Sequence, residues 1–146
     1  MSYKKVKKGV YYLKDAKATV DKSSIEFLID ECKSDGINMA RICLHKNESS
    51  KLMIMLIVLV NKFVYPPHRH IWKEESYTII EGKGTYEEYD SKGKMLFFYN
   101  LEKGETLLNN HKNRFHAIKP ISNPFVFLET TTGPFLDRPL EYMKTF

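Results

Sequence analysis

Three histidines and one glutamate in the middle of the chain have the types and spacing of a metal site. His68 and His70 are separated only by Arg69, and four residues lie between His70 and Glu75. On a β-strand, alternate side chains share a face, so both imidazoles can converge on one ion. His116 offers a third imidazole farther along the chain. Three nitrogens and a carboxylate suit Zn, Fe, Ni or Mn, so we predict one divalent transition metal on these four residues.

A second histidine competes with His116 for the last ligand position. His111 lies in the polar stretch Asn110–Arg114, whereas His116 lies in the apolar stretch Phe115–Ile118. The polar stretch is typical of a turn and the apolar stretch of a strand. We therefore favour His116 and keep His111 as the alternative.

Two residues near Glu75 have secondary roles in this interpretation. If Glu75 points inwards, Tyr77 does too, so its hydroxyl could donate a hydrogen bond near the metal or simply pack in the core. Lys73 lies in the loop over the site, where it could hold an anionic substrate or could be a solvated loop lysine.

The elements that position these residues are one helix and a series of short strands. Ile25, Leu28, Ile29 and Cys32 recur at helical spacing. We expect Ser23 and Glu26 to form the capping box at the start of this helix, and we expect the helix to end at Gly36. The predicted strands are 40–44, 53–60, 62–65, 75–81, 85–89, 95–101, 114–118 and 125–130, with turns at 82–84, 90–94 and 102–104. The run Leu52–Val60 does not alternate, so we expect both its faces to be covered, as beneath the helix.

Length and composition indicate one domain in a reducing compartment. The chain has 146 residues, a net charge of +5 and two cysteines outside any metal-binding spacing. Lysines cluster in the first 22 residues, and we interpret residues 1–20 as a basic, solvated segment before a single domain at 21–146. The chain shows neither a nucleic-acid-binding signature nor an apolar run near the ~20 residues of a membrane span. We expect a cytoplasmic protein without nucleic-acid or membrane partners.

The pattern His68-x-His70-x4-Glu75-x6-Gly82 resembles the first cupin motif, and Gly104…His116 a degraded second one. More narrowly, Ala40–His45, Pro67–His70 and Glu129 to Phe135 resemble the WbuC family of cupin metalloproteins, over roughly 21–136. The resemblance implies a mainly β protein: a cupin double-stranded β-helix, or jelly-roll barrel, with the N-terminal α-helix packed outside. The Pro-x-Gly that usually precedes the second-motif histidine is absent, which keeps His111 in competition.

The resemblance also implies roles and a substrate class. Arg41 and His45 match the family's Arg…Leu-His segment and would line the pocket mouth with Glu129, which could instead bond a ligand imidazole. WbuC proteins are associated with O-antigen and other surface-polysaccharide clusters, so the implied substrate is a sugar or sugar nucleotide. The leading hypothesis is a metal-dependent enzyme of isomerase or epimerase type in which Tyr77 and Glu129 are catalytic and Arg41, His45 and Lys73 bind substrate. A non-catalytic metal- or carbohydrate-binding cupin and an iron-dependent dioxygenase are the alternatives, and a homodimer is a possible assembly.

Overall fold

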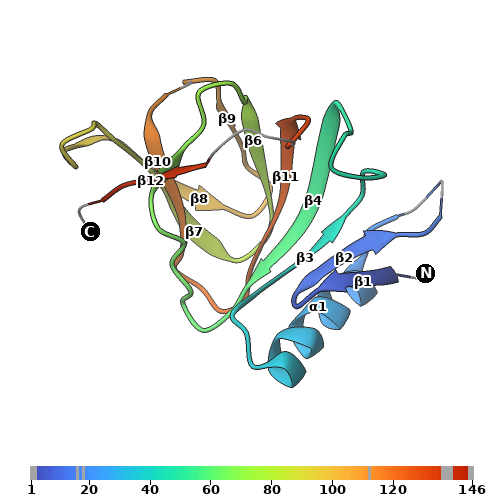
Figure 1. The fold of residues 1–146 in the computed structure, drawn as a ribbon. Helices are drawn as coiled ribbons and strands as arrows, with labels where there is room; N and C mark the ends of the chain where they lie inside the picture. The colour runs from blue at the N-terminus through green and yellow to red at the C-terminus, as the bar shows by residue number, and fades with distance from the viewer. Residues whose placement is uncertain (1–2, 16, 18, 112, 136–139, 145–146) are drawn as a thin grey trace.

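The computed structural model describes residues 3–15, 17, 19–111, 113–135 and 140–144. Met1 and Ser2 of the expected basic segment, Lys112 beside His111, and Leu136 at the end of the WbuC resemblance lie outside these residues. Two β-sheets face each other, and one helix lies against the outside of the larger sheet (Figure 1).

The larger sheet has seven strands in the order β1-β2-β3-β4-β11-β6-β9. Their bounds are β1 Tyr3–Lys7, β2 Val10–Leu13, β3 Met39–Cys43, β4 Leu52–Leu59, β11 Phe125–Thr132, β6 Glu75–Glu81 and β9 Thr106–Asn109. The smaller sheet has the order β12-β5-β10-β7-β8. Its bounds are β12 Glu141–Tyr142, β5 His68–Arg69, β10 Phe115–Pro120, β7 Lys83–Tyr89 and β8 Met95–Glu102.

The order of the strands defines the fold. The quartet β4-β11-β6-β9 faces the quartet β5-β10-β7-β8. The chain alternates between the two sheets from β4 to β7 and again from β8 to β11, and the hairpin β7–β8 lies within the smaller sheet, as in a double Greek key. Gly82, with φ of 85°, lies between β6 and β7, where the chain crosses from one sheet to the other. This is the jelly-roll barrel expected from the sequence, and the prediction of a mainly β fold with one external helix is confirmed.

The helix α1 spans Lys22–Asp35 and covers the outer face of the larger sheet (Figure 1). Leu28 and Cys32 of α1 pack with Leu56 and Val58 of β4. On the other face of β4, Met55, Ile57 and Leu59 point into the barrel with Tyr77 and Phe127. Both faces of β4 are therefore buried, as its unbroken apolar run predicted.

The cap of α1 differs from the prediction. Asp21, and not Ser23, is the N-cap, and its carboxylate accepts a hydrogen bond of 3.1 Å from the Ser24 amide. Ser24 in turn accepts from the backbone N–H of Asp21, so the capping box is Asp21 with Ser24. The helix still ends at Gly36, which adopts the left-handed conformation as expected.

Two further expectations are corrected. Within the expected solvated segment 1–20, the described stretches Tyr3–Lys7 and Val10–Leu13 belong to the larger sheet, because β1 and β2 pair with each other and β2 pairs in parallel with β3. Lys5 of β1 contacts Glu31 and Asp35 of α1 at 3.2 and 2.6 Å, so part of the basic charge is neutralised by the helix. The segment 62–65 is not a strand, because Asn61 and Lys62 adopt positive φ and break the extended chain.

The only helix among the described residues is too short and too polar to cross a lipid bilayer.

Candidate metal centre

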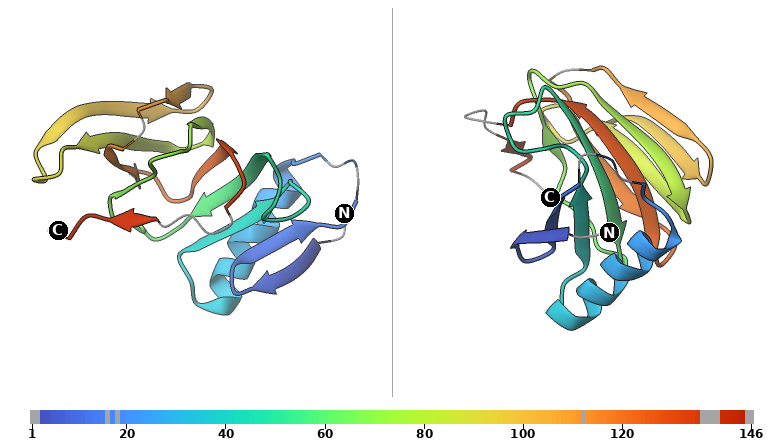
Figure 2. Two further views of the ribbon diagram at one scale, coloured as in Figure 1. Left: turned by 45° about the horizontal axis from the view of Figure 1, so that its top comes forward. Right: turned by 90° about the vertical axis from the view of Figure 1, so that its right-hand side faces the viewer.

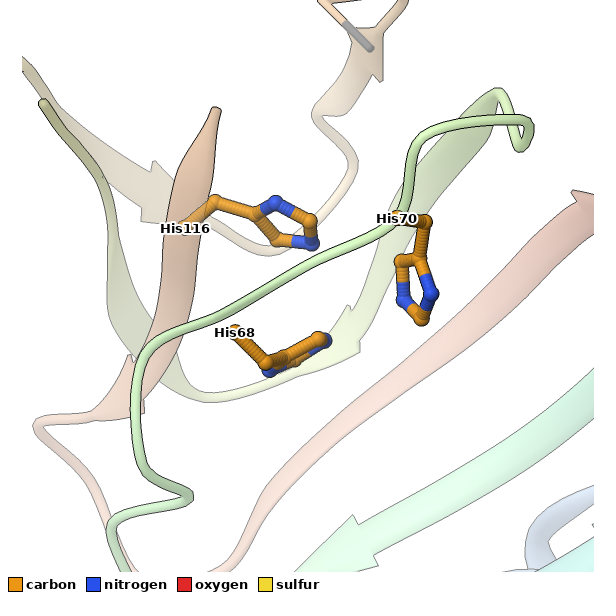
Figure 3. A group of neighbouring side chains, drawn as sticks. All are labelled: His68, His70 and His116. Carbon is orange, nitrogen blue, oxygen red and sulfur yellow. The ribbon is translucent and has the colours of Figure 1, made fainter. Parts of the chain in front are cut away.

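The barrel brings His68, His70 and His116 together from two separate parts of the chain (Figure 3). His68 of β5 lies directly opposite His116 of β10 in the antiparallel register. The centres of these two rings are 4.6 Å apart. The centre of the His70 ring lies 5.0 Å from that of His68 and 5.7 Å from that of His116. One ligand nitrogen from each of the three rings falls within 4.8 Å of the others.

The alternation of side chains sets this convergence although β5 is only two residues long. Arg69, between the two histidines, points the other way and pairs with Glu141 of β12 at 2.6 Å. This ion pair holds the short strand on its outer side while His68 and His70 face the interior.

Backbone carbonyls orient two of the rings. His68 Nδ1 lies 3.2 Å from the Pro66 carbonyl oxygen, and His116 Nδ1 lies 3.1 Å from that of Arg114. A carbonyl oxygen only accepts, so each Nδ1 carries the proton and each Nε2 keeps a free lone pair. The buried His116 Nε2 makes no hydrogen bond in the described structure. An orphaned buried nitrogen aimed at two other imidazoles is what a metal ligand requires.

Glu75, the first residue of β6, brings the carboxylate to the same point. Its oxygens lie 2.9 Å from His116 Nε2 and 3.3 Å from His70 Nε2. Two donors bound to one ion at 2.0–2.1 Å stand about 2.9 to 3.4 Å apart, so these spacings fit a shared metal. Tyr77 donates a hydrogen bond of 3.0 Å to Glu75 and fixes its orientation. The ligand atoms of the three histidines lie together, and Glu75 contacts two of them, His70 and His116, so its carboxylate is the candidate for the fourth ligand.

The protonation states also suit metal binding. Burial lowers the pKa of His68 to about 3, with help from the nearby His116 and His70 rings, and burial also lowers the pKa of His70. Burial opposes ionisation of Glu75, but the contacts of His116 and His70 and the charge of Lys73 outweigh it and hold the pKa of Glu75 well below its usual range. At neutral pH, therefore, His68 and His70 are neutral and Glu75 is charged, which is the form that binds a metal.

His111 lies away from this cluster. Its side chain is 59 % exposed and its Nδ1 lies 3.4 Å from Glu88, a residue that Arg114 also contacts at 3.3 Å. Of the two competing histidines, the structure places His116 with His68 and His70.

Lys73 is buried, which the interpretation as a solvated loop lysine did not anticipate. Its side chain is 3 % exposed, and its ammonium donates a hydrogen bond of 3.0 Å to Glu75. The same ammonium lies 3.9 Å from Glu129 and 4.5 Å from the centre of the Phe135 ring. Lys73 therefore places a positive charge between two carboxylates at the edge of the candidate metal centre.

Glu129 of β11 and Tyr77 of β6 are neighbours in the register of the larger sheet. Burial, and then the negative charge of Glu75, raise the pKa of Glu129, although Lys73 and Arg41 partly oppose this effect. Burial raises the pKa of Tyr77 well above its usual value, so its hydroxyl stays protonated and can donate the hydrogen bond to Glu75. Glu129 is not the partner of a ring Nδ1 of His68 or His116, because backbone carbonyls hold both.

A cavity of about 310 Å³ opens in front of the candidate metal centre. Arg41, Lys73, Glu129 and Tyr77 line it, as do all four proposed ligands. The Arg41 Nε is buried and makes no hydrogen bond in the described structure. The remaining wall is largely apolar and includes Met39, Met55, Ile57, Leu59, Phe127 and Phe135.

His45 is the predicted site residue that the structure places elsewhere. It is not among the described residues that line the cavity, and its Nδ1 lies 3.2 Å from the Ile54 amide nitrogen. The same Nδ1 lies 3.1 Å from the Ile54 carbonyl oxygen, so in either tautomer it bonds to the backbone of Ile54. His45 therefore joins its loop to β4, and its expected place at the pocket mouth is corrected.

Several residues of the cavity wall were not predicted from the sequence. Tyr65 packs edge-on against His68 at 5.3 Å, and its hydroxyl lies 2.6 Å from that of Tyr142. Trp72 and Glu48 also line the cavity. Trp72 could have been found by continuing the alternation His68, His70, Trp72, whereas Glu48 lies in a loop with no sequence signal.

Neither a family model nor a curated protein matches the sequence. Solved structures do resemble the fold. KdgF from Halomonas sp. aligns over 68 % of this chain and 82 % of its own, at 16 % identity and a TM-score of 0.53. A cupin superfamily protein from Desulfitobacterium hafniense covers 64 % of this chain and 76 % of its own, at 17 % identity and a TM-score of 0.53. An uncharacterized conserved protein from Klebsiella pneumoniae with a double-stranded β-helix domain covers 73 % and 85 %, at 12 % identity and a TM-score of 0.56. The chain thus has the cupin fold, and identities this low establish the fold alone.

We expect metal removal to leave the fold intact. The barrel core is formed by apolar side chains of β4, β6, β7 and β11, and the ligands lie at one side of it. A chelator should therefore lower the melting temperature of metal-loaded protein, as loss of any native-state ligand does, without removing the β-sheet circular dichroism. Complete unfolding on chelation would show that the metal is structural, as in a zinc finger.

Proposed function

We propose that this chain is a metal-dependent cupin enzyme, akin to the WbuC family, that acts on a sugar or sugar nucleotide in surface-polysaccharide synthesis. The observation that supports metal binding is the cluster of three imidazoles, contacted by the Glu75 carboxylate, at the wall of the cavity. The sugar context rests on the sequence resemblance. We place the protein in the cytoplasm, which is compatible with the two buried free thiols, Cys32 and Cys43.

In this proposal His68, His70, Glu75 and His116 hold one divalent ion, which Zn, Fe, Ni or Mn could supply. Once bound, the ion would polarise a substrate carbonyl or hydroxyl, or activate a water. Tyr77 keeps Glu75 in place by its hydrogen bond, and is a positioning residue for the centre. Glu129, whose pKa is raised by burial, is the group suited to hold a proton and exchange it with the substrate.

The two cations of the cavity favour a substrate with an anionic group, such as the phosphate of a sugar nucleotide. Arg41 has a buried Nε without a partner, and guanidinium groups bind carboxylates and phosphates through paired donors. Lys73 provides a second, point-like charge in the same cavity.

The test is turnover of a panel of nucleotide sugars by metal-loaded protein, followed by NMR. We expect conversion of at least one compound, and we expect Arg41→Met to raise its KM by about tenfold or more through loss of the charged contact. Lys46→Met, a change at an exposed position of the neighbouring loop, is the matched control and should leave KM unchanged.

Two other outcomes would refute the proposed reaction. Saturable binding without turnover would favour a non-catalytic carbohydrate-binding cupin. Oxygen consumption that requires iron would favour a dioxygenase. The geometry around the histidines is compatible with all three functions. The products of the assay, or their absence, therefore distinguish the three functions.

A further inference from the structure

The ammonium of Lys73 is held against the carboxylate that the proposed centre uses as a ligand. It donates a hydrogen bond of 3.0 Å to Glu75 Oε1, and its side chain is only 3 % exposed. Glu129 Oε1 lies 3.9 Å from the same nitrogen, and the centre of the Phe135 ring lies 4.5 Å from it. Water and salt screen a buried charge weakly, so Lys73 acts strongly on the groups around it.

The backbone next to Lys73 is fixed by β11. The Glu74 amide donates to Thr132 Oγ1 at 3.1 Å, and the Thr132 amide donates to the Glu74 carbonyl oxygen at 3.1 Å. β11 lies between β4 and β6 in the larger sheet, and it also carries Glu129 (Figure 2). One strand therefore holds both the loop of Lys73 and the second carboxylate near its ammonium, so the fold itself sets the position of this charge.

Lys73 and Tyr77 donate to different oxygens of the same carboxylate. Lys73 donates to Glu75 Oε1 and Tyr77 to Glu75 Oε2, both at 3.0 Å. Both hydrogen bonds orient the carboxylate, but the ammonium also brings a positive charge. A cation beside a ligand carboxylate offsets part of its negative charge and repels a divalent ion, so it weakens metal binding. A neutral hydroxyl that only orients the ligand strengthens metal binding.

We propose that Lys73 offsets the charge of Glu75, so that the centre holds its divalent ion less tightly than the ligands alone would and keeps more positive charge for an anionic substrate. The inference rests on the proposed function, because it needs a metal ion bound at His68, His70, Glu75 and His116. Lys73 acts through Glu75 and is therefore a positioning residue. It follows that the two donors of Glu75 have opposite effects on metal affinity, although their hydrogen bonds have the same length.

The first test is the affinity of the full chain for Co²⁺ at pH 8, measured by competitive titration. We expect Lys73→Met to raise this affinity by at least about tenfold, because it removes the opposing charge and keeps most of the side-chain volume. Tyr77→Phe is the matched control: it removes a hydrogen bond to the same carboxylate without changing the charge, and it should lower the affinity by about tenfold. If Lys73 only supported the structure, both variants would bind Co²⁺ more weakly. An affinity of Lys73→Met at or below that of the wild type would overturn the proposal.

The second test is the binding of azide, a small anion, to the Co²⁺-loaded protein, followed by visible absorption. Lys73→Met should raise the dissociation constant of azide by about fivefold or more, because a positive charge near the centre is lost. Tyr77→Phe should leave the dissociation constant within about twofold of the wild type, since the charge is unchanged. Azide binding to Lys73→Met that is as tight as in the wild type would overturn the proposal.

A second background covers the case in which Lys73→Met does not fold. Lys73→Met leaves Glu129 without its ammonium neighbour, so the same change is also made in Glu129→Gln, where that carboxylate is absent. The double variant should bind Co²⁺ at least about tenfold more tightly than Glu129→Gln alone, and equal or weaker binding would overturn the proposal. A wild-type chain that binds no Co²⁺ would refute the metal centre and this inference with it. Co²⁺ binding to the wild type that Lys73→Met leaves unchanged would refute the role of Lys73 alone.

Discussion

Replacement of His116 by alanine is expected to lower the affinity for a divalent transition metal by at least about 100-fold. The His116 Nε2 is buried, lacks a hydrogen bond, and faces Glu75 at 2.9 Å, so its loss removes a ligand from a set whose other members stay in place. Even residues that only orient metal ligands typically change affinity 10- to 100-fold, and a ligand should exceed that effect. The measurement is a competitive metal titration at a pH where the imidazoles are neutral.

The matched control is His111→Ala. His111 is exposed and contacts Glu88, so its replacement should leave metal affinity within about twofold of the wild type. The double variant with alanine at both His68 and His70 should lose the stoichiometric metal. If His111→Ala is more damaging than His116→Ala, the second motif is shifted by five residues and the donor set proposed above is wrong.

Replacement of Lys73 by methionine is expected to destabilise the metal-free protein by about 3–5 kcal/mol at pH 8, the usual cost of leaving a buried charge unpaired. The Lys73 ammonium lies 3.0 Å from Glu75 and 3.9 Å from Glu129, and methionine keeps most of the side-chain volume while removing the charge. Urea denaturation of chelator-treated protein measures the difference. Lys22→Met, at an exposed ion pair with Glu26, should change stability by less than about 1 kcal/mol.

The deficit of Lys73→Met should shrink as the pH falls from 8 to 5. Folding already raises the pKa of Glu129 above its ordinary 4.5, and loss of the Lys73 charge should raise it further. A carboxyl with a raised pKa contributes stability that is present below its unfolded pKa and is lost as the pH rises through its folded pKa. Glu75, whose pKa lies well below 4.5, stays charged in the wild type from pH 8 to pH 5, so the stability that it contributes to the wild type does not change over this range. An equal deficit at pH 5 and pH 8 would instead indicate lost packing of the lysine stem.

The local parts of the candidate site could be predicted from the sequence because they depend on short-range geometry. The spacing of His68, His70 and Glu75 needs only the alternation of an extended chain and one turn. The structure places His68 and His70 in one cluster and Glu75 at 3.3 Å from His70. The bounds of β6, Glu75–Glu81, match the predicted strand, and the helix ends at Gly36 as expected. Each of these features depends only on residues that are close together in the sequence.

The tertiary structure decided the features that depend on distant partners. From the sequence, Lys73 is expected to be a loop lysine. In the structure its charge is buried because Glu129 and Phe135, from the far end of the chain, lie against it. The pairing of His45 with Ile54, nine residues away, removes it from the cavity.

The N-terminal hairpin shows the same division between sequence and structure. Lysine-rich β1 has no apolar alternation, yet it pairs with β2, which joins β3, while Lys5 finds two carboxylates on α1. The sequence by itself determined which residues could bind a metal and that the chain would fold into paired strands. Tertiary packing decided which histidine joins the cluster, which charges are buried and which strand edge stays open. The physical reason is that burial and charge pairing depend on contacts between residues far apart in the chain, and residue spacing does not encode those contacts.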